Sequence, residues 1–271
     1  MTTVQPSQFG YRRGVAVLGS SIATAPGAIS LAVGAVLWEV IGRVAEVRFF
    51  PPLSNVLARL VEMTADGLIL ESLAASLMNL VIGLAISVAG GVAVGMLMGA
   101  YPRVYSALDI YVYALLTAPA LVFAPIFFSI FGTDRASIVA VIVVYTVFII
   151  IVNTADGIKS VSPPLIQMAR SFNASDRQIL FRIMFPAAMP MILTGIRLGT
   201  GRAVKGMING EMFIAVVGLG RVVSQAGGRF DGESVLAILL VIIVVALVAV
   251  RLVQGLDRRL TSWLPDTARG A

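Results

Sequence analysis

The stretch SLAASLMNLVIGLAISVAGGVAVGMLMGAYP, residues 72–102, contains no charged side chain. A helix needs about 20 mostly apolar residues to cross the hydrocarbon core of a bilayer, so this stretch is long enough to span a membrane. Similar uncharged runs cover residues 14–38, 110–133, 136–155 and 234–250. The sequence therefore predicts an all-α, polytopic membrane protein in which each of these runs is a transmembrane helix.

A further apolar stretch, residues 186–220, differs from the others because it carries Arg197, Arg202, Lys205 and Glu211. Ionisable groups at membrane depth are costly unless they face water, protein or one another. We therefore expect about six spans in all, and we expect the charged span to be the functional one.

The composition excludes several classes of protein. The chain is 58% hydrophobic and only 13% charged, with a mean hydropathy of +0.96, whereas soluble domains carry about 25% charged residues. It has a net charge of +6, but the basic residues are scattered in ones and twos between apolar runs, which indicates that they determine the topology of the spans and do not bind nucleic acid. It contains no Cys and no His, so thiolate or imidazole metal sites and the usual catalytic bases are absent.

Lys and Arg are enriched in cytoplasmic segments, which predicts the orientation. If the amino terminus is cytoplasmic, that side holds the larger set of basic residues: Arg12, Arg13, Arg103, Lys159, Arg170, Arg177, Arg182, Arg251, Arg258, Arg259 and Arg269. The other side holds the smaller set: Arg43, Arg48, Arg59, Arg135, Arg221 and Arg229. We therefore predict that residues 1–13 are a cytoplasmic tail and that both termini are cytoplasmic.

The first span is compatible with two fates. Residues 23–25 resemble a signal peptidase site and follow Arg12 and Arg13. However, Pro26 would follow the cut, and apolar character continues to Trp38. We predict an uncleaved helix that begins between residues 14 and 26, with cleavage as the alternative.

Two spans carry signals of packing and bending. In the second span a small residue recurs at every fourth position, which predicts a smooth face for close helix packing; the residues are Gly83, Ser87, Gly91, Gly95 and Gly99. In the third span, Pro119 and Pro125 each remove a backbone hydrogen bond, so we expect kinks there.

The loop at residues 47–71 is predicted to be periplasmic and to contain a short amphipathic helix. Its apolar residues recur with helical spacing after Ser54, which we expect to cap the helix. The pattern leaves open whether this helix lies on lipid or on the bundle.

The segment at residues 159–186 predicts two short capped helices. Ser162 and Pro163 are a typical start, and an apolar face of Leu165, Met168, Ala169 and Phe172 follows. Asn173 suits the left-handed position that ends a helix. Ser175 and Gln178 predict a capping box for the next helix, which we expect to end at Pro186. Such an element is suited to docking a partner, or alternatively it folds back on its own bundle.

These residues resemble a known family. QMARSFNASDRQILFRIMFPAAMP (residues 167–190) followed by GIRLG (residues 195–199) is similar to the cytoplasmic coupling motif of binding-protein-dependent ABC importer permeases, in the branch for nitrate, sulfonates and taurine. Together with the weaker similarities FPPLSNVL, ASLMNL and GEM, at residues 50–57, 75–80 and 210–212, the resemblance covers roughly Phe50 to the carboxyl end.

The chain departs from the family pattern at three places. The family motif begins with Glu and two Ala, whereas Gln167, Met168 and Ala169 stand here, and Asn173 replaces a Gly. Asn79 replaces an Arg that is usual in the second span. A salt bridge from the first Glu cannot form, but Asn173 can adopt the same turn.

The resemblance implies a single permease domain over residues 1–271 with the type I ABC importer fold, in a bacterial inner membrane. It also implies the partners: two cytoplasmic ABC ATPase subunits, a second permease copy or paralogue, and an extracytoplasmic solute-binding protein. ATP and Mg²⁺ would bind the ATPases, since this chain contains no Gly-Lys pair and hence no phosphate-binding loop and needs no cofactor itself. The residues expected to couple to the ATPases are Gln167, Met168, Ala169, Arg170, Phe172, Asn173, Ala174, Arg177 and Pro186.

The charged span predicts a translocation pathway for a small anion. The residues assigned to it are Asn79, Arg197, Arg202, Lys205, Asn209 and Glu211. Cations outnumber the one carboxylate, which favours anions. Alternatively, the arginines are structural and lie near the inner interface. Because an unpaired carboxylate at depth is costly, Glu211 is predicted to pair with Lys205 or with a residue of the second copy.

Other classes fit less well. A secondary carrier or channel would work without an ATPase and would need no docking helices. An intramembrane enzyme would need a nucleophile with a base or a metal cluster, and a structural scaffold would not need the charged span.

Overall fold

The computed structural model describes residues 24–45, 49–214 and 216–260, and every regular element within them is a helix. The elements are α2 (Thr24–Val44), α3 (Leu53–Ala65), α4 (Leu68–Ala100), α5 (Pro102–Thr117), the 3₁₀ helix η1 (Ala120–Phe123), α6 (Ala124–Phe131), α7 (Arg135–Lys159), α8 (Pro163–Ser171), α9 (Asp176–Ile179), the π-helical turn η2 (Leu180–Met184), α10 (Phe185–Ile214), α11 (Gly218–Gly228) and α12 (Gly232–Leu260).

The number of spans agrees with the sequence. Among the described residues, five helices are long and apolar enough to cross a membrane, and α5 with α6 forms a sixth span that bends by 97°. The first of these helices, α2, ends at Val44, before the loop predicted to start at residue 47, and Glu39 and Arg43 form an ion pair of 2.6 Å along it. The predicted tail at residues 1–13 and the start of the first helix lie outside the described residues.

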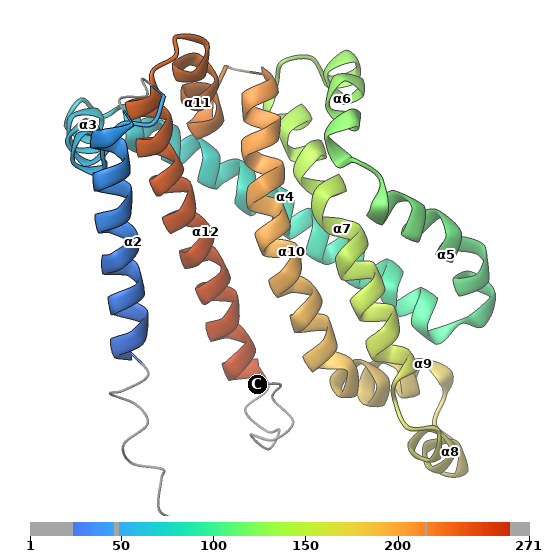
Figure 1. The fold of residues 1–271 in the computed structure, drawn as a ribbon. Coiled ribbons are helices and arrows are strands. Elements are labelled where there is room, and N and C mark those ends of the chain that lie inside the picture. The colour runs from blue at the N-terminus through green and yellow to red at the C-terminus, as the bar shows by residue number, and fades with distance from the viewer. Residues whose placement is uncertain (1–23, 46–48, 215, 261–271) are drawn as a thin grey trace, which may run out of the picture.

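Figure 1 shows the arrangement of the spans. The helices α4, α7 and α10 form the packed centre, with α12 and α2 on one side and the bent pair α5 and α6 on the other. The short helices α8 and α9 lie at the end of the bundle where α2 begins and α12 ends, whereas α3, α6 and α11 lie at the opposite end.

The small-residue stripe of α4 packs against α7. A Cβ atom built on Gly83 would collide with Ile142, one on Gly91 with Ile150, and one on Gly99 with Ile158. Because each glycine meets the residue the same number of positions further along, α4 and α7 run parallel in close contact. The predicted packing role of the stripe is confirmed.

Gly95 provides the sharpest test of this contact. A Cβ atom at Gly95 would lie 2.5 Å from Cβ of Thr154 and 2.7 Å from the backbone oxygen of Ile151, which cannot rotate away. We expect Gly95→Ala to destabilise the bundle by about 1–3 kcal/mol, as overpacking of a core does. Unfolding of the purified protein by heat or denaturing detergent measures this. The control is Gly90→Ala, since nothing lies within 4 Å of a Cβ atom there; equal stability of the two variants would contradict the packing.

The kink expected in the third span is present at Pro119, where the two halves of the span meet at 97°, but not at Pro125. Pro119 stands where α5 has ended and η1 begins, so the span is broken and not merely bent. Pro125 lies in the first turn of α6, where a missing N–H costs no hydrogen bond. The segment between α5 and η1 therefore leaves non-helical backbone within a span.

The amphipathic helix of the 47–71 loop is present as α3, but the expected cap is wrong. Pro52 is the N-cap residue, and Ser54 lies inside the helix. The backbone N–H and the hydroxyl of Ser54 both donate to the carboxylate of Glu39, each at 2.9 Å, so α2 supplies the cap. Val56 and Met63 are buried against the bundle, which answers the question left open by the sequence.

The same end of the molecule is held by a polar junction between α3 and α12. Arg59 donates to the Ser234 hydroxyl at 3.0 Å, and Ser234 donates from both its hydroxyl and its amide to Asp231. Burial alone would raise the pKa of Asp231, but the hydrogen bonds from Ser234 and the charge of Arg59 lower it on balance. The Asp231 carboxylate therefore stays ionised where α12 begins.

The predicted break at Pro186 is wrong. Residues Asp176–Ile214 form one continuous helical span. The wider π-helical turn Leu180–Met184 precedes Pro186 and relieves the clash that proline causes in a regular helix. The far end also differs from the expected span, because α10 stops at Ile214 and a separate helix, α11, follows.

Candidate functional site

The first candidate site is the elbow formed by α8 and α9 at one end of the bundle (Figure 1). Helix α8 begins as expected, with Ser162 at the N-cap position and Pro163 at the first helical position. The Ser162 side chain makes no capping hydrogen bond, so its position is confirmed but its expected bond is not.

The turn between α8 and α9 is a complete Schellman motif. The N–H of Asn173 donates to the carbonyl of Arg170 at 2.9 Å, and the N–H of Ala174 donates to the carbonyl of Ala169 at 3.1 Å. Asn173 has a φ of 56°, which places it in the left-handed region. The prediction that Asn can take the place of the usual Gly is confirmed.

Substitution of Asn173 tests how strongly this turn depends on the left-handed conformation. Asn173→Gly should keep the elbow, whereas Asn173→Val should weaken it by about 1 kcal/mol or more, because a β-branched residue at positive φ is strained. Hydrogen exchange of the α8 amides measures local opening. Faster exchange in the Gly variant than in the Val variant would contradict the expectation.

Helix α9 begins with the predicted capping box. The Ser175 hydroxyl accepts from the backbone N–H of Gln178 at 3.3 Å, and the side-chain oxygen of Gln178 accepts from the backbone N–H of Ser175 at 2.8 Å. Arg170 and Asp176 add an exposed ion pair of 3.5 Å across the turn. Such a pair contributes little to stability, so the backbone motif and the box hold the angle of the elbow.

The apolar residues of α8 divide into two sets. Leu165, Met168 and Phe172 are exposed, and Phe172 is 81% accessible. Ala169 is only 7% accessible and faces the protein itself. We call Leu165, Met168 and Phe172 the elbow face. Ala169 is therefore not part of the outward surface, while Gln167, Arg170 and Arg177 are exposed and Ala174 is half-buried.

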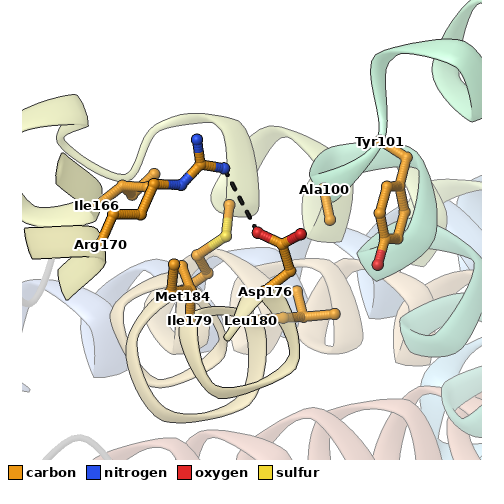
Figure 2. A pocket seen from close by; sticks show the side chains of 8 residues that line it. All are labelled: Ala100, Tyr101, Ile166, Arg170, Asp176, Ile179, Leu180 and Met184. Atoms are coloured by element: carbon orange, nitrogen blue, oxygen red, sulfur yellow. Dashed lines mark hydrogen bonds and ion pairs between the residues drawn. The ribbon is translucent and has the colours of Figure 1, made fainter. Parts of the chain in front are cut away.

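The inner side of the elbow faces the end of α4 across a pocket. Figure 2 shows the pocket between them, of about 260 Å³. Arg170 reaches across towards Asp176 on one side, and Ala100 and Tyr101 stand on the other. The remaining lining residues are Ile166, Ile179, Leu180 and Met184. Because the elbow continues into α10 through η2, and Leu180 of η2 packs with Met96 of α4, a displacement of α8 would act on both spans.

A second candidate site lies on α10 at membrane depth. Arg202 and Lys205 line a cavity of about 250 Å³ together with residues of α5, α7 and the α5–η1 break. Asn209, on the same side of α10, donates to the hydroxyl of Tyr145, another lining residue, at 2.7 Å. Arg197 is half-buried and does not line this cavity.

Glu211 and Asn79 lie elsewhere, in a buried polar cluster. The Glu211 carboxylate is fully buried and accepts hydrogen bonds from the Ser76 hydroxyl at 2.8 Å, the Asn79 amide at 3.2 Å and the backbone N–H of Gly220 at 3.1 Å. The predicted pairing with Lys205 is wrong, since Lys205 is exposed in the other site. A second copy cannot reach Glu211 either, because its own chain covers it.

The cluster joins three helices. Ser76 also accepts from the N–H of Leu219, so the first amides of α11 meet side chains of α4 and α10. The positive end of the α11 dipole faces the carboxylate, which favours its charge. Gly218 has a φ of 80°, and a Cβ atom there would strike Glu211. The sequence did not predict the roles of Ser76 and of the backbone amides of residues 219 and 220. Gly218 and Gly220, close after Glu211 in the sequence, could have indicated that backbone approaches this carboxylate closely.

Comparisons with known proteins find similar sequences along most of this chain. The family model of the binding-protein-dependent transport system inner membrane component matches residues 91–262. The chain is 32% identical to the taurine transport system permease protein TauC of Escherichia coli over 79% of this chain and 80% of that protein. It is 31% identical to the formylaminopyrimidine transport permease protein ThiX of Halalkalibacterium halodurans over 84% of this chain and 91% of that protein.

A solved structure shares the fold. The inward-facing MetNI methionine ABC transporter matches with a TM-score of 0.61 at 16% identity, over 69% of this chain and 93% of that chain. This likeness supports the type I ABC importer permease fold that the sequence predicted.

Proposed function

The chain belongs to the family of binding-protein-dependent transport system inner membrane components, and from this premise we propose that it is the membrane subunit of an ATP-driven importer. The proposal includes two ATPase subunits that bind the elbow face, a second permease copy, and a solute-binding protein at the opposite end. It places the elbow and both termini in the cytoplasm. The single observation that carries it is the elbow face itself, an apolar surface held at a fixed angle by the Schellman motif and the capping box.

The absence of a phosphate-binding loop supports ATP hydrolysis on a partner. The sequence contains no Gly-Lys pair, which the loop that cradles nucleotide phosphates requires. ATP and Mg²⁺ would therefore act on the separate subunits, and this chain would receive their motion through α8.

The continuous helix from α9 through η2 into α10 supports a mechanism for that transmission. A closing ATPase dimer would push α8 sideways, and the capped turn would pass the displacement to α10 without a loop to absorb it. The movement would shift the balance between inward-open and outward-open states. Each ligand must prefer one of these states by a few kcal/mol for the shift to be effective.

The position of Lys205 supports a water-filled pathway between two copies. Lys205 is exposed on this chain although it lies within a membrane span. A lysine facing lipid there would be strongly unfavourable, so this side of α10 must meet water or protein. Together with Arg202, Lys205 favours an anionic solute. The names of the relatives alone do not assign a solute to this chain.

Reconstitution tests the proposal. The chain is co-expressed with an ATPase subunit and a solute-binding protein, and the complex is purified and placed in proteoliposomes. We expect co-purification of the ATPase and uptake that requires internal ATP. Uptake driven by an ion gradient without any ATPase would instead identify a secondary carrier and would overturn the proposal.

A further inference from the structure

The cavity on α10 contains an unusual arrangement of charge. Arg202 and Lys205 both line it, and no Asp or Glu is among its lining residues. Residues three apart on a helix have Cβ atoms about 5–6 Å apart, so the two cations are neighbours. Neither takes part in a salt bridge or hydrogen bond with another side chain in the part of the chain that the structure describes. Two adjacent cations without a carboxylate repel each other, and a bound anion would relieve that repulsion.

The cavity is also far from either membrane surface. Tyr145, which lines it, lies near the middle of α7, between the charged ends Arg135 and Lys159. At a rise of 1.5 Å per residue, this position is about 15–20 Å from each end of the helix. The cationic groups are therefore poorly placed to reach lipid phosphates, and a structural role at the inner interface does not fit this depth.

Tyr145 supplies a third donor. Its hydroxyl oxygen accepts from Asn209 at 2.7 Å. A phenol can donate one hydrogen bond as well as accept, and its donor has no acceptor within the described ranges 24–45, 49–214 and 216–260. Asn209 thus positions a hydroxyl whose hydrogen is available to a ligand.

The remaining wall is apolar. It consists of aliphatic residues of α5, α7 and the broken segment: Leu115, Leu116, Ala118, Ala120 and Val144. Non-helical backbone is tolerated at membrane depth only where it is buried in protein or lines a cavity. A ligand that fills the cavity would therefore present an anionic head to α10 and a short apolar body to the α5–η1 break.

We propose that Arg202, Lys205 and the Tyr145 hydroxyl form a binding subsite inside the membrane for a small organic oxoanion, a sulfonate or carboxylate with a short aliphatic body. This inference rests on the proposed function, since it places the subsite on the transport route. It differs from a general preference for anions, because the apolar wall distinguishes organic from inorganic anions.

Binding in lipid nanodiscs tests the subsite without any ATPase. The full chain is placed in phosphatidylcholine discs, and line broadening of 2,2,2-trifluoroethanesulfonate is followed by ¹⁹F NMR. We expect binding by the unaltered chain and a loss of affinity of about tenfold or more in Arg202→Gln and Lys205→Ala, as removal of a charge-assisted hydrogen bond predicts. Tyr145→Phe should weaken binding by a smaller factor. Undiminished binding by the Arg202 and Lys205 variants would overturn the subsite.

Matched variants separate charge from folding. Arg251→Gln removes an exposed cation from α12, outside the cavity, and should bind normally. Lys205→Arg keeps the charge and should retain most of the affinity. Loss of binding in Arg251→Gln as great as in Lys205→Ala would overturn the assignment, because net charge alone would then explain it.

Competitors identify the ligand class. We expect nitrate and the neutral trifluoroethanol to compete at least tenfold less well than ethanesulfonate. Equal competition by nitrate would overturn the role of the apolar wall, and equal competition by trifluoroethanol would overturn the role of the cations. Loss of probe binding when phosphatidylglycerol replaces part of the phosphatidylcholine would assign the site to lipid. Each result leaves the ATP-dependent uptake assay unaffected, so failure of the subsite and failure of the proposed function are distinguishable.

Discussion

Replacement of Met168 and Phe172 together by Asp is expected to abolish ATP-driven uptake while the bundle stays folded. Both side chains are exposed, at 53% and 81%, so their loss removes little from the core. In a complex, however, each new carboxylate would be buried without a partner in an apolar contact, which costs several kcal/mol. The bound fraction of ATPase after affinity purification measures the effect, and we expect it to fall by about 100-fold or more.

The matched control lies at the opposite end of the molecule. Val61→Asp introduces the same carboxylate on an exposed apolar position of α3, at 69% accessibility. It should leave ATPase binding unchanged, because α3 and the elbow lie at opposite ends of the bundle (Figure 1). Normal ATPase recovery with the double variant would show that the elbow face is not the docking surface.

Ala169 provides a contrast that the sequence pattern could not. The helical spacing grouped it with Leu165, Met168 and Phe172, yet it packs inward at 7% accessibility. A large acidic residue at Ala169 would therefore damage the elbow itself, and a loss of uptake would not report on docking. For that reason the exposed pair is the informative one.

The features predicted correctly depend on residues that are close together in the sequence. Spans follow from long apolar runs, the α4 stripe from a strict four-residue repeat, and the elbow from the signals at Asn173, Ser175 and Gln178. Each depends on interactions within one helix or turn, or on a face that any partner helix would cover. Such features can be predicted without knowing which helices pack against each other.

Two of the following three errors depend on residues far apart in the chain, and the third depends on a local change of helix type. Ser54 was expected to cap α3, but Glu39 of α2 performs that role. Pro186 was expected to end a helix, but the π-helical turn accommodates it. Glu211 was expected to pair with Lys205 or with a residue of the second copy, but hydrogen bonds from α4 and α11 satisfy it instead. Several partners could satisfy the hydrogen bonds of one such polar group equally well. The sequence does not say which partner the fold brings next to it.

Replacement of Glu211 by Ala is expected to be the most destabilising single change in the chain. It leaves the Ser76 hydroxyl, the Asn79 amide and the Gly220 N–H without their acceptor in a site with no exposure. Each buried donor left without its acceptor costs about 1–3 kcal/mol, so we expect the variant to lose about 3 kcal/mol or more. The free energy of unfolding in detergent, followed by circular dichroism, measures the loss, and hydrogen exchange should show early opening of α11.

Glu211→Gln separates hydrogen bonding from charge at the same position. The Gln oxygen can still accept from Ser76 and Gly220, and its amide can donate to the side-chain oxygen of Asn79, which is buried without a partner. The Gln variant should therefore stay within about 1 kcal/mol of the unaltered chain. An Ala variant as stable as the Gln variant would show that the cluster does not hold α4, α10 and α11 together. A Gln variant that folds normally but no longer transports would instead show that the charge of Glu211 is needed for transport, as expected for a residue of the translocation pathway.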